Sequence, residues 1–204
     1  MLESERKKLF DPKIEYVNIG ISEGGVAYGM IPVMWDSTAA AYNMKSPNVF
    51  ISPEDLCDGE VMARIRSLNV RGLYIYTPLD DYGFIADFSD LYDIHIECAE
   101  NMKNLDFLSE MHDCAMLFLH NANLSDIDVL WEVKKANKGI VRAFRYVGLY
   151  DCNVDKTPDF SDCRCYFTEF LVWSKPENAE RDREKWSSLN ALTKKYYLIQ
   201  PKKK

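Results

Sequence analysis

Short runs in which two apolar side chains flank one other residue recur through the middle of the chain. Their first residues are 24, 21, 23, 27 and 21 positions apart. Such alternation predicts β-strands with one apolar face. The spacing is too long for hairpins and leaves room for a return segment, so we expect a mostly parallel sheet with strands in chain order. The runs are Val49-Phe50-Ile51, Leu73-Tyr74-Ile75, Ile94-His95-Ile96, Leu117-Phe118-Leu119, Phe144-Arg145-Tyr146 and Cys165-Tyr166-Phe167.

Three of these runs carry a further apolar or cysteine side chain three positions earlier. Two of them read Leu-x-x-Ile-x-Ile at residues 91–96 and Cys-x-x-Leu-x-Leu at residues 114–119. With the unit lengths, these motifs resemble the strand half of the leucine-rich-repeat family. Ala99 and Ala122 stand where the family has asparagine or cysteine, so the resemblance is to a divergent form. It implies an α/β fold, a leucine-rich-repeat-like solenoid with a mostly parallel sheet over residues 46–173.

The two ends of the chain have other patterns, and we expect them to cap the repeats within one folded unit. In the N-terminal segment, residues 1–45, two alternating runs around Glu23-Gly24-Gly25 predict a β-hairpin. In the C-terminal segment, residues 174–204, an apolar stripe predicts a capping helix, followed by a basic tail. The stripe consists of Trp186, Leu189, Leu192 and Tyr196.

Helical return segments are expected between the predicted strands. Residues 125–136 have helical apolar spacing, an N-cap candidate at Ser125 and Gly139 beyond the end, and they predict a helix. Residues 59–67 and 102–111 favour shorter helices. Residues 80–90 favour an irregular loop.

The outward positions of the predicted strands are rich in aromatic and histidine side chains, which are common at binding hot spots. The alternative is that they stabilise the sheet by cross-strand pairing or are covered by a terminal segment. The leucine-rich-repeat resemblance favours the binding of a partner protein, because members of the family typically bind proteins with this face. One predicted row contains Tyr74, His95, Phe118, Arg145 and Tyr166, and the next contains Tyr76, Glu97, His120, Val147 and Thr168.

Charge and hydropathy narrow the classes of partner. The chain has 25 basic and 32 acidic residues and a net charge of −7, which disfavours nucleic acid. The first residues are charged rather than apolar, and no later stretch approaches about 18 uninterrupted apolar residues. We therefore expect a cytoplasmic protein that binds no membrane. Six cysteines scattered through strand-like segments are expected to stay reduced.

The candidate chemical motifs are weak. Cys163-Arg164-Cys165 has no second ligand pair, and no nearby histidine, for a zinc site. The acidic clusters, including residues 87–93, favour capping and loop formation rather than calcium binding. The N-terminal glycines do not form a phosphate-binding motif. We therefore expect no metal, no cofactor and no catalytic residue.

The resulting hypothesis is a non-enzymatic protein-interaction module that binds a partner protein through the exposed sheet face. Two alternatives stay open. One is a small-ligand-binding protein or enzyme with a pocket around His95, Glu97 and His120. The other is an immunity-type protein that neutralises a basic effector, since opposite charge speeds association.

Overall fold

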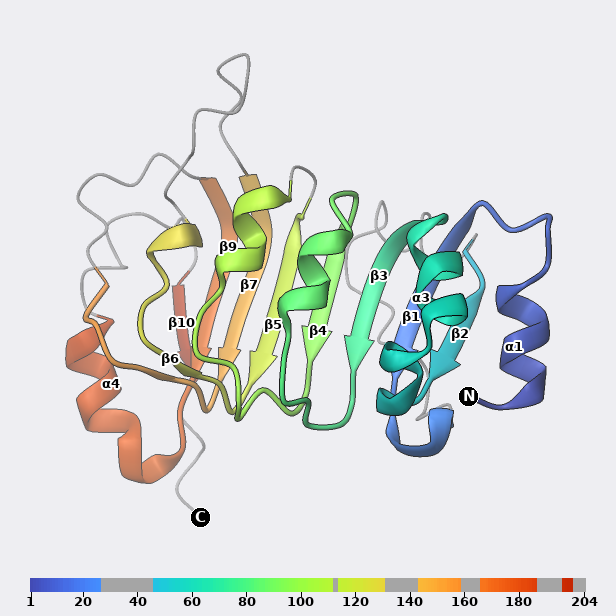
Figure 1. Ribbon diagram of the computed structural model, residues 1–204. Coiled ribbons are helices and arrows are strands. Elements are labelled where there is room, and N and C mark those ends of the chain that lie inside the picture. Colours follow the sequence, from blue (N-terminus) through green and yellow to red (C-terminus); the bar gives the residue numbers. More distant parts are fainter. Residues whose placement is uncertain (27–45, 112–113, 131–142, 159–165, 187–195, 200–204) are drawn as a thin grey trace.

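One eight-stranded sheet organises the computed structural model, which describes residues 1–26, 46–111, 114–130, 143–158, 166–186 and 196–199 (Figure 1). Every pairing in this sheet is parallel, and the order is β10-β9-β7-β5-β4-β3-β1-β2. A small parallel pair, β6 (Asn123–Leu124) and β8 (Asn153–Val154), lies apart from it. The strands of the large sheet are β1 (Tyr16–Ile21), β2 (Asn48–Ile51), β3 (Asn69–Ile75), β4 (Asp93–Ile96), β5 (Met116–His120), β7 (Ala143–Tyr150), β9 (Tyr166–Trp173) and β10 (Tyr196–Ile199).

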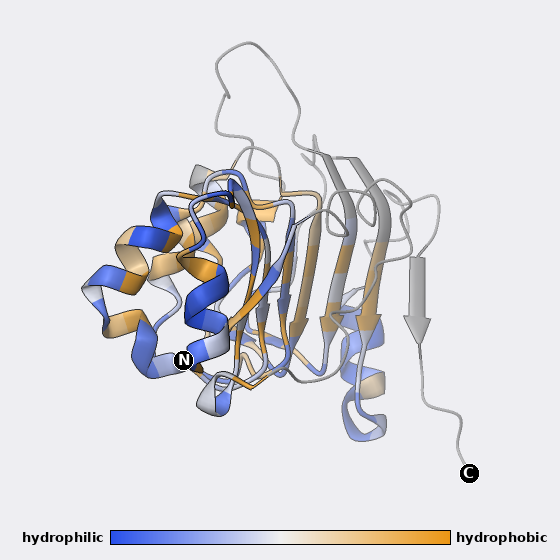
Figure 2. Ribbon diagram, turned by 90° about the vertical axis from the view of Figure 1, so that its right-hand side faces the viewer, coloured by the Kyte–Doolittle hydropathy of each residue, from blue (hydrophilic) through white to orange (hydrophobic). Residues whose placement is uncertain are grey.

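The predicted stacking of the central strands is confirmed. β3, β4, β5 and β7 contain the predicted runs that begin at residues 73, 94, 117 and 144, β9 begins within the last run at Tyr166, and these strands lie in chain order. The return segments pack against one face of this sheet (Figures 1 and 2). In the described residues they contain the 3₁₀ segments η2 (Pro53–Cys57), η3 (Gly83–Asp87), η4 (Asp106–Glu110), η5 (Asp128–Leu130) and η6 (Pro176–Asn178), and η2 and η6 are each followed by an α-helix.

Three α-helices complete the described structure: α1 (Glu3–Leu9), α3 (Gly59–Arg66) and α4 (Ala179–Lys185). The α3 helix matches the expectation for residues 59–67, and Asp58 caps it by accepting hydrogen bonds from the first-turn amides. The α1 helix covers the edge strand β2, where the buried Glu5 carboxylate accepts the Phe50 N–H at 2.9 Å. None of the helices in the described residues is long and apolar enough to span a membrane.

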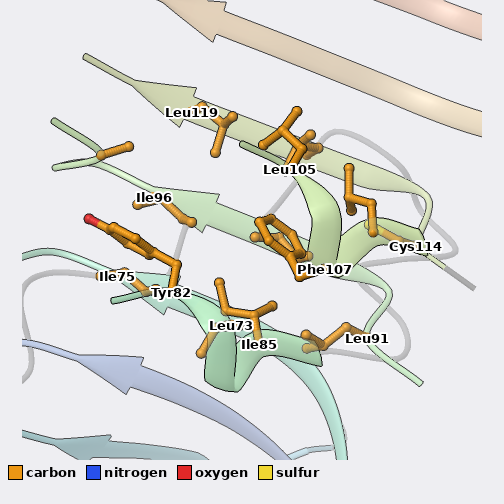
Figure 3. Close-up of a cluster of buried hydrophobic side chains, with 14 of the residues drawn as sticks. Leu73, Ile75, Tyr82, Ile85, Leu91, Ile96, Leu105, Phe107, Cys114 and Leu119 are labelled. Carbon is orange, nitrogen blue, oxygen red and sulfur yellow. The ribbon is translucent and has the colours of Figure 1, made fainter. Parts of the chain in front are cut away.

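The core lies between the sheet and the return segments. Side chains of the strands, such as Leu73, Ile96 and Leu119, meet Ile85 and Phe107 of the 3₁₀ turns (Figure 3). The strand register aligns the inward residues into two ladders, all of whose members are buried. The first ladder is Val49, Ile19, Leu73, Ile94, Leu117, Val147 and Phe170, and the second is Ile51, Ile21, Ile75, Ile96, Leu119, Leu149 and Val172.

The predicted N-terminal hairpin is wrong. β1 pairs in parallel with β2 on one side and β3 on the other, so neither edge is free for an antiparallel partner. Gly24 and Gly25 do form a turn, with φ of 67° and 66°, within η1 (Glu23–Gly25). This turn begins a long crossover to β2 instead of a hairpin, and residues 27–31 lie outside the described part. β2 is consequently separated from β3 by β1.

The predicted C-terminal capping helix needs correction as well. α4 ends at Lys185, and Tyr196 belongs to β10, so one helix does not continue through the whole apolar stripe.

Within the predicted helix of residues 125–136, the structure describes only the 3₁₀ turn η5 up to residue 130. Residues 102–111 and 80–90 each contain one 3₁₀ turn. The basic tail, residues 202–204, lies outside the described residues.

Three strand glycines make room for aromatic rings on the sheet face opposite the core. A Cβ at Gly72 would lie 2.7 Å from the Tyr74 ring and 3.0 Å from an Asn18 oxygen. Similar contacts, at 2.5 and 2.6 Å, place Phe50 over Gly20 and Phe118 over Gly148. The rings fill the space that side chains at these positions would occupy.

We predict that Gly72→Ala destabilises the protein by about 1–3 kcal/mol, because the Tyr74 ring is fully buried and cannot move aside. Gly59→Ala is the matched control, since a Cβ there meets nothing within 4 Å and alanine favours the helix. Denaturant unfolding of both variants measures the difference. Equal midpoints would contradict the packing of Tyr74 over Gly72.

Candidate functional site

The strand register defines the rows of side chains on the sheet face opposite the core. In the middle row, Tyr74, His95 and Phe118 lie side by side as predicted. β7 and β9 contribute Gly148 and Leu171 to this row. The middle row contains Phe50, Gly20, Tyr74, His95, Phe118, Gly148 and Leu171.

The prediction that Arg145 and Tyr166 belong to this row is therefore wrong. Both lie nearer the beginnings of β7 and β9, which are eight residues long and begin earlier relative to their neighbours than β4 and β5 do. Their side chains lie outside the described part of the structure, as does that of Thr168. Val147 was also placed outward, but it is fully buried in the core.

The side chains of the middle row pack mostly against other residues of the protein. Tyr74 is completely buried and packs with Phe50, while Phe118 is 9% exposed and packs with Ala115 and Met116. Phe118 also contacts the His95 ring and lies over Gly148, so packing between strands accounts for these two aromatic side chains. Accessible surface on this face therefore has to be sought beyond the middle row.

A buried acidic residue supports Tyr74. The Tyr74 hydroxyl donates a hydrogen bond of 2.8 Å to Oδ2 of Asp93, whose side chain is fully buried. Burial raises the pKa of Tyr74 far above its usual value, and the Asp93 charge acts in the same direction. The sequence interpretation placed Asp93 in a loop cluster. The sequence contained a signal for this position. Asp93 lies two residues before His95, so both side chains belong to the same strand face.

The next row lies at the C-terminal ends of the strands. We call it the strand-end row, and its residues are partly exposed. Backbone hydrogen bonds from Tyr76 N to Ile21 O and from Glu97 N to Ile75 O, both 2.8 Å, continue the sheet to this level. β5, β7 and β9 contribute residues that pair directly in the register. The row comprises Tyr76, Glu97, His120, Tyr150 and Trp173.

Two histidines surround the Glu97 carboxylate. His95 Nε2 lies 3.1 Å from Glu97 Oε1, and His120 Nδ1 lies 3.8 Å from Glu97 Oε2. The His95 and His120 rings stack with centroids 5.4 Å apart, and the Tyr150 ring stacks on His120 at 4.5 Å. The structure thus brings together the three residues that the sequence proposed as a pocket centre.

The contacts within this cluster shift the pKa values of its members. The close approach of His95 lowers the pKa of Glu97, while burial opposes the shift. Burial lowers the pKa of His120, with the nearby Glu97 charge acting in the opposite direction and His95 reinforcing the shift. At neutral pH the cluster therefore pairs an ionised carboxylate with a neutral His120 imidazole.

The cysteines near the cluster are protonated thiols. Burial raises the pKa of Cys152 to about 12, and its Sγ contacts the Leu119 and Tyr150 carbonyls at 3.4 and 3.5 Å. Burial likewise raises the pKa of Cys98, whose Sγ lies 3.7 Å from the Tyr76 carbonyl. Neither is an activated nucleophile. Cys163 and Cys165 lie outside the described residues.

A cavity of about 410 Å³ lies away from the histidine cluster. Its lining comes from η3, η4 and the adjoining loops, including Asp81, Tyr82, Lys103 and Phe107. These segments pack against the core side of the sheet, whereas His95, Glu97 and His120 belong to the opposite face. The cavity therefore does not enclose the predicted pocket centre.

Comparison with known proteins supplies no further constraint on the site. No protein-family model, curated protein or solved structure matches this chain.

We predict that Tyr74→Phe lowers the free energy of unfolding by about 1–3 kcal/mol, because it removes a hydrogen-bond donor from the buried Asp93 carboxylate. Tyr16→Phe is the control, since Tyr16 is 44% exposed and the new ring can still lie beneath the Arg71 guanidinium. Urea unfolding of both variants is the measurement. A Tyr74→Phe variant as stable as the control would show that this hydrogen bond contributes nothing.

Proposed function

We propose that this chain is a divergent leucine-rich-repeat-like solenoid that binds a partner protein through its strand-end row. The observation that carries the proposal is a stacked, partly exposed set of rings at the ends of adjacent parallel strands. His120 and Tyr150 are stacked with an interplanar angle of 17°, and Trp173 stands beside Tyr150 in the register. With neighbouring strands about 4.8 Å apart, the five positions extend over roughly 19 Å.

Rigid aromatic side chains suit protein recognition for a physical reason. Their rings bring a large contact area, and stacking already fixes their rotamers before binding. Less side-chain entropy is then lost when the complex forms. The strand-end row combines this property with partial exposure, whereas Tyr74 in the middle row is fully covered.

The proposed partner has a basic surface. The chain has a net charge of −7, which attracts a cationic protein at long range. Glu97, whose side chain is 39% exposed, stands within the strand-end row beside the exposed rings. An arginine of the partner could lie against the face of an exposed ring and pair with a carboxylate. Neutralisation of a basic effector is one form of this function.

The repeat-like part of the proposal rests on the arrangement of β3, β4, β5, β7 and β9. The described parts of the return segments lie on one face, and each next strand is added at the same edge of the sheet. In such stacking the return segments cover one face, and the other face carries the outward strand residues, including the strand-end row. At one end of the sheet the strands do not follow chain order, because β1 lies between β2 and β3.

We predict that Tyr76→Ser combined with Tyr150→Ser weakens partner binding at least about 100-fold, because each hot-spot aromatic contributes about 2 kcal/mol. The partner is first captured from the source cells on the unmodified chain and identified by mass spectrometry. Binding isotherms with the purified partner then compare the variants. Circular dichroism melting establishes that each variant is folded.

Tyr16→Ser is the matched control, because it removes the same side chain at an exposed position outside the row. The proposal also requires association to slow as salt increases, since exposed charges are screened. A partner that binds the folded double variant as tightly as the control would place the interface elsewhere. A partner with an acidic surface would contradict the electrostatic part of the proposal.

A further inference from the structure

The cluster of His95, Glu97 and His120 has the composition and spacing of a metal site. One potential ligand atom of each residue lies within 4.8 Å of those of the other two. We infer that these three residues bind a divalent transition-metal ion of the zinc type. This inference rests on their geometry and chemistry and is independent of the proposed partner protein.

The distances suit a metal ion between the side chains. Zinc binds nitrogen and oxygen ligands at about 2.0–2.2 Å, so two ligands at a tetrahedral angle are roughly 3.3 Å apart. The separations of Glu97 oxygens from His95 Nε2 and His120 Nδ1 are 3.1 and 3.8 Å, on either side of that value. The two contacts use different oxygens of the carboxylate, so a shared metal ion requires the side chains to rotate toward one point.

The scaffold holds the ligands in place. His95 lies in β4 and Glu97 directly follows this strand, two positions on, so they share a sheet face, and His120 ends the neighbouring strand β5. Both strands are internal, with hydrogen-bonded neighbours on each side. The Tyr150 ring packs against one face of the His120 ring. Ligands on rigid, packed elements need little reorganisation when a metal binds.

His95 provides a second, independent observation. Both ring nitrogens of His95 are buried, and neither makes a well-aligned hydrogen bond within the described residues, although Nε2 lies close to Glu97. A buried polar atom without such a bond costs about 1–3 kcal/mol. A metal ion bound to one ring nitrogen would satisfy that atom.

The donor set selects the class of metal. Two imidazoles and one carboxylate suit zinc and neighbouring transition metals, whereas calcium and magnesium prefer oxygen ligands alone. Three protein ligands leave a fourth position for water or another donor. Because the cluster lies partly within the strand-end row, where Glu97 and His120 are 39% and 29% exposed, that position can open toward solvent.

The test is a titration of untagged, chelator-treated full-length protein with zinc chloride, in competition with a chromophoric chelator. We expect one zinc ion per chain. His95→Gln, Glu97→Gln and His120→Gln should each weaken zinc binding at least about 100-fold, as expected for loss of a direct ligand when even supporting residues contribute about 10–100-fold. Glu100→Gln is the matched control, because it removes an exposed carboxylate three positions from Glu97 and should leave the affinity unchanged.

Thiols are the competing zinc ligands in this chain, so the titration is repeated on Cys57→Ser and on the double variant Cys163→Ser, Cys165→Ser. Substitution with cobalt gives a readout that does not depend on variants. Nitrogen and oxygen ligation lacks the strong near-ultraviolet charge-transfer band of a cobalt–thiolate bond. A thiolate band, loss of zinc binding in the cysteine variants, or equal affinity in the His120→Gln and unmodified proteins would overturn the inference.

Discussion

Because successive side chains of a strand point to opposite faces, sliding one strand by a single residue would exchange its buried and outward side chains. In this chain seven strands contribute to two apolar ladders, represented by Leu73, Ile94 and Leu117 in one and by Ile75 and Ile96 in the other. A slip of one residue in any strand would bring its polar or aromatic outward residues into the core. The position of every group on the opposite face, including the histidine cluster, follows from this register.

The opposite face is packed to different degrees along the strands. In the middle row, rings over glycines and the hydrogen bond from Tyr74 to the buried Asp93 leave little accessible surface. At the strand ends, the face still has stacked rings but is partly open. The middle row supports the strand-end row, because His95 belongs to the middle row and contacts Glu97 in the strand-end row. The middle of the strands is therefore tightly packed, whereas the strand ends are partly accessible to solvent.

The sequence predicted the strands of the central sheet and the cluster on their outer face because those signals are local. β4 and β5 have similar lengths and begin at similar points, so counting from the first apolar residue aligned His95 with Phe118. The same counting failed for Arg145, because β7 begins earlier relative to its neighbour. Insertion of β1 between β2 and β3 depends on a long crossover, for which a sequence has no local pattern. Asp93 was missed because an acidic residue beside a turn looks solvated until its burial is known.

The two proposed activities of the strand ends make different use of charge. In the metal-free cluster the Glu97 carboxylate lies beside a neutral His120 imidazole, so its negative charge stays available to a cationic partner. A bound divalent ion would instead make the cluster locally positive, yet it would offset only two of the seven net negative charges. Long-range attraction of a basic protein therefore survives metal binding, since it depends on the whole charge distribution. At short range, a partner side chain would ligate the metal at its open position instead of forming an ion pair with Glu97. Metal binding would therefore change which side chain of the partner is recognised, while the partner would still be attracted to the protein.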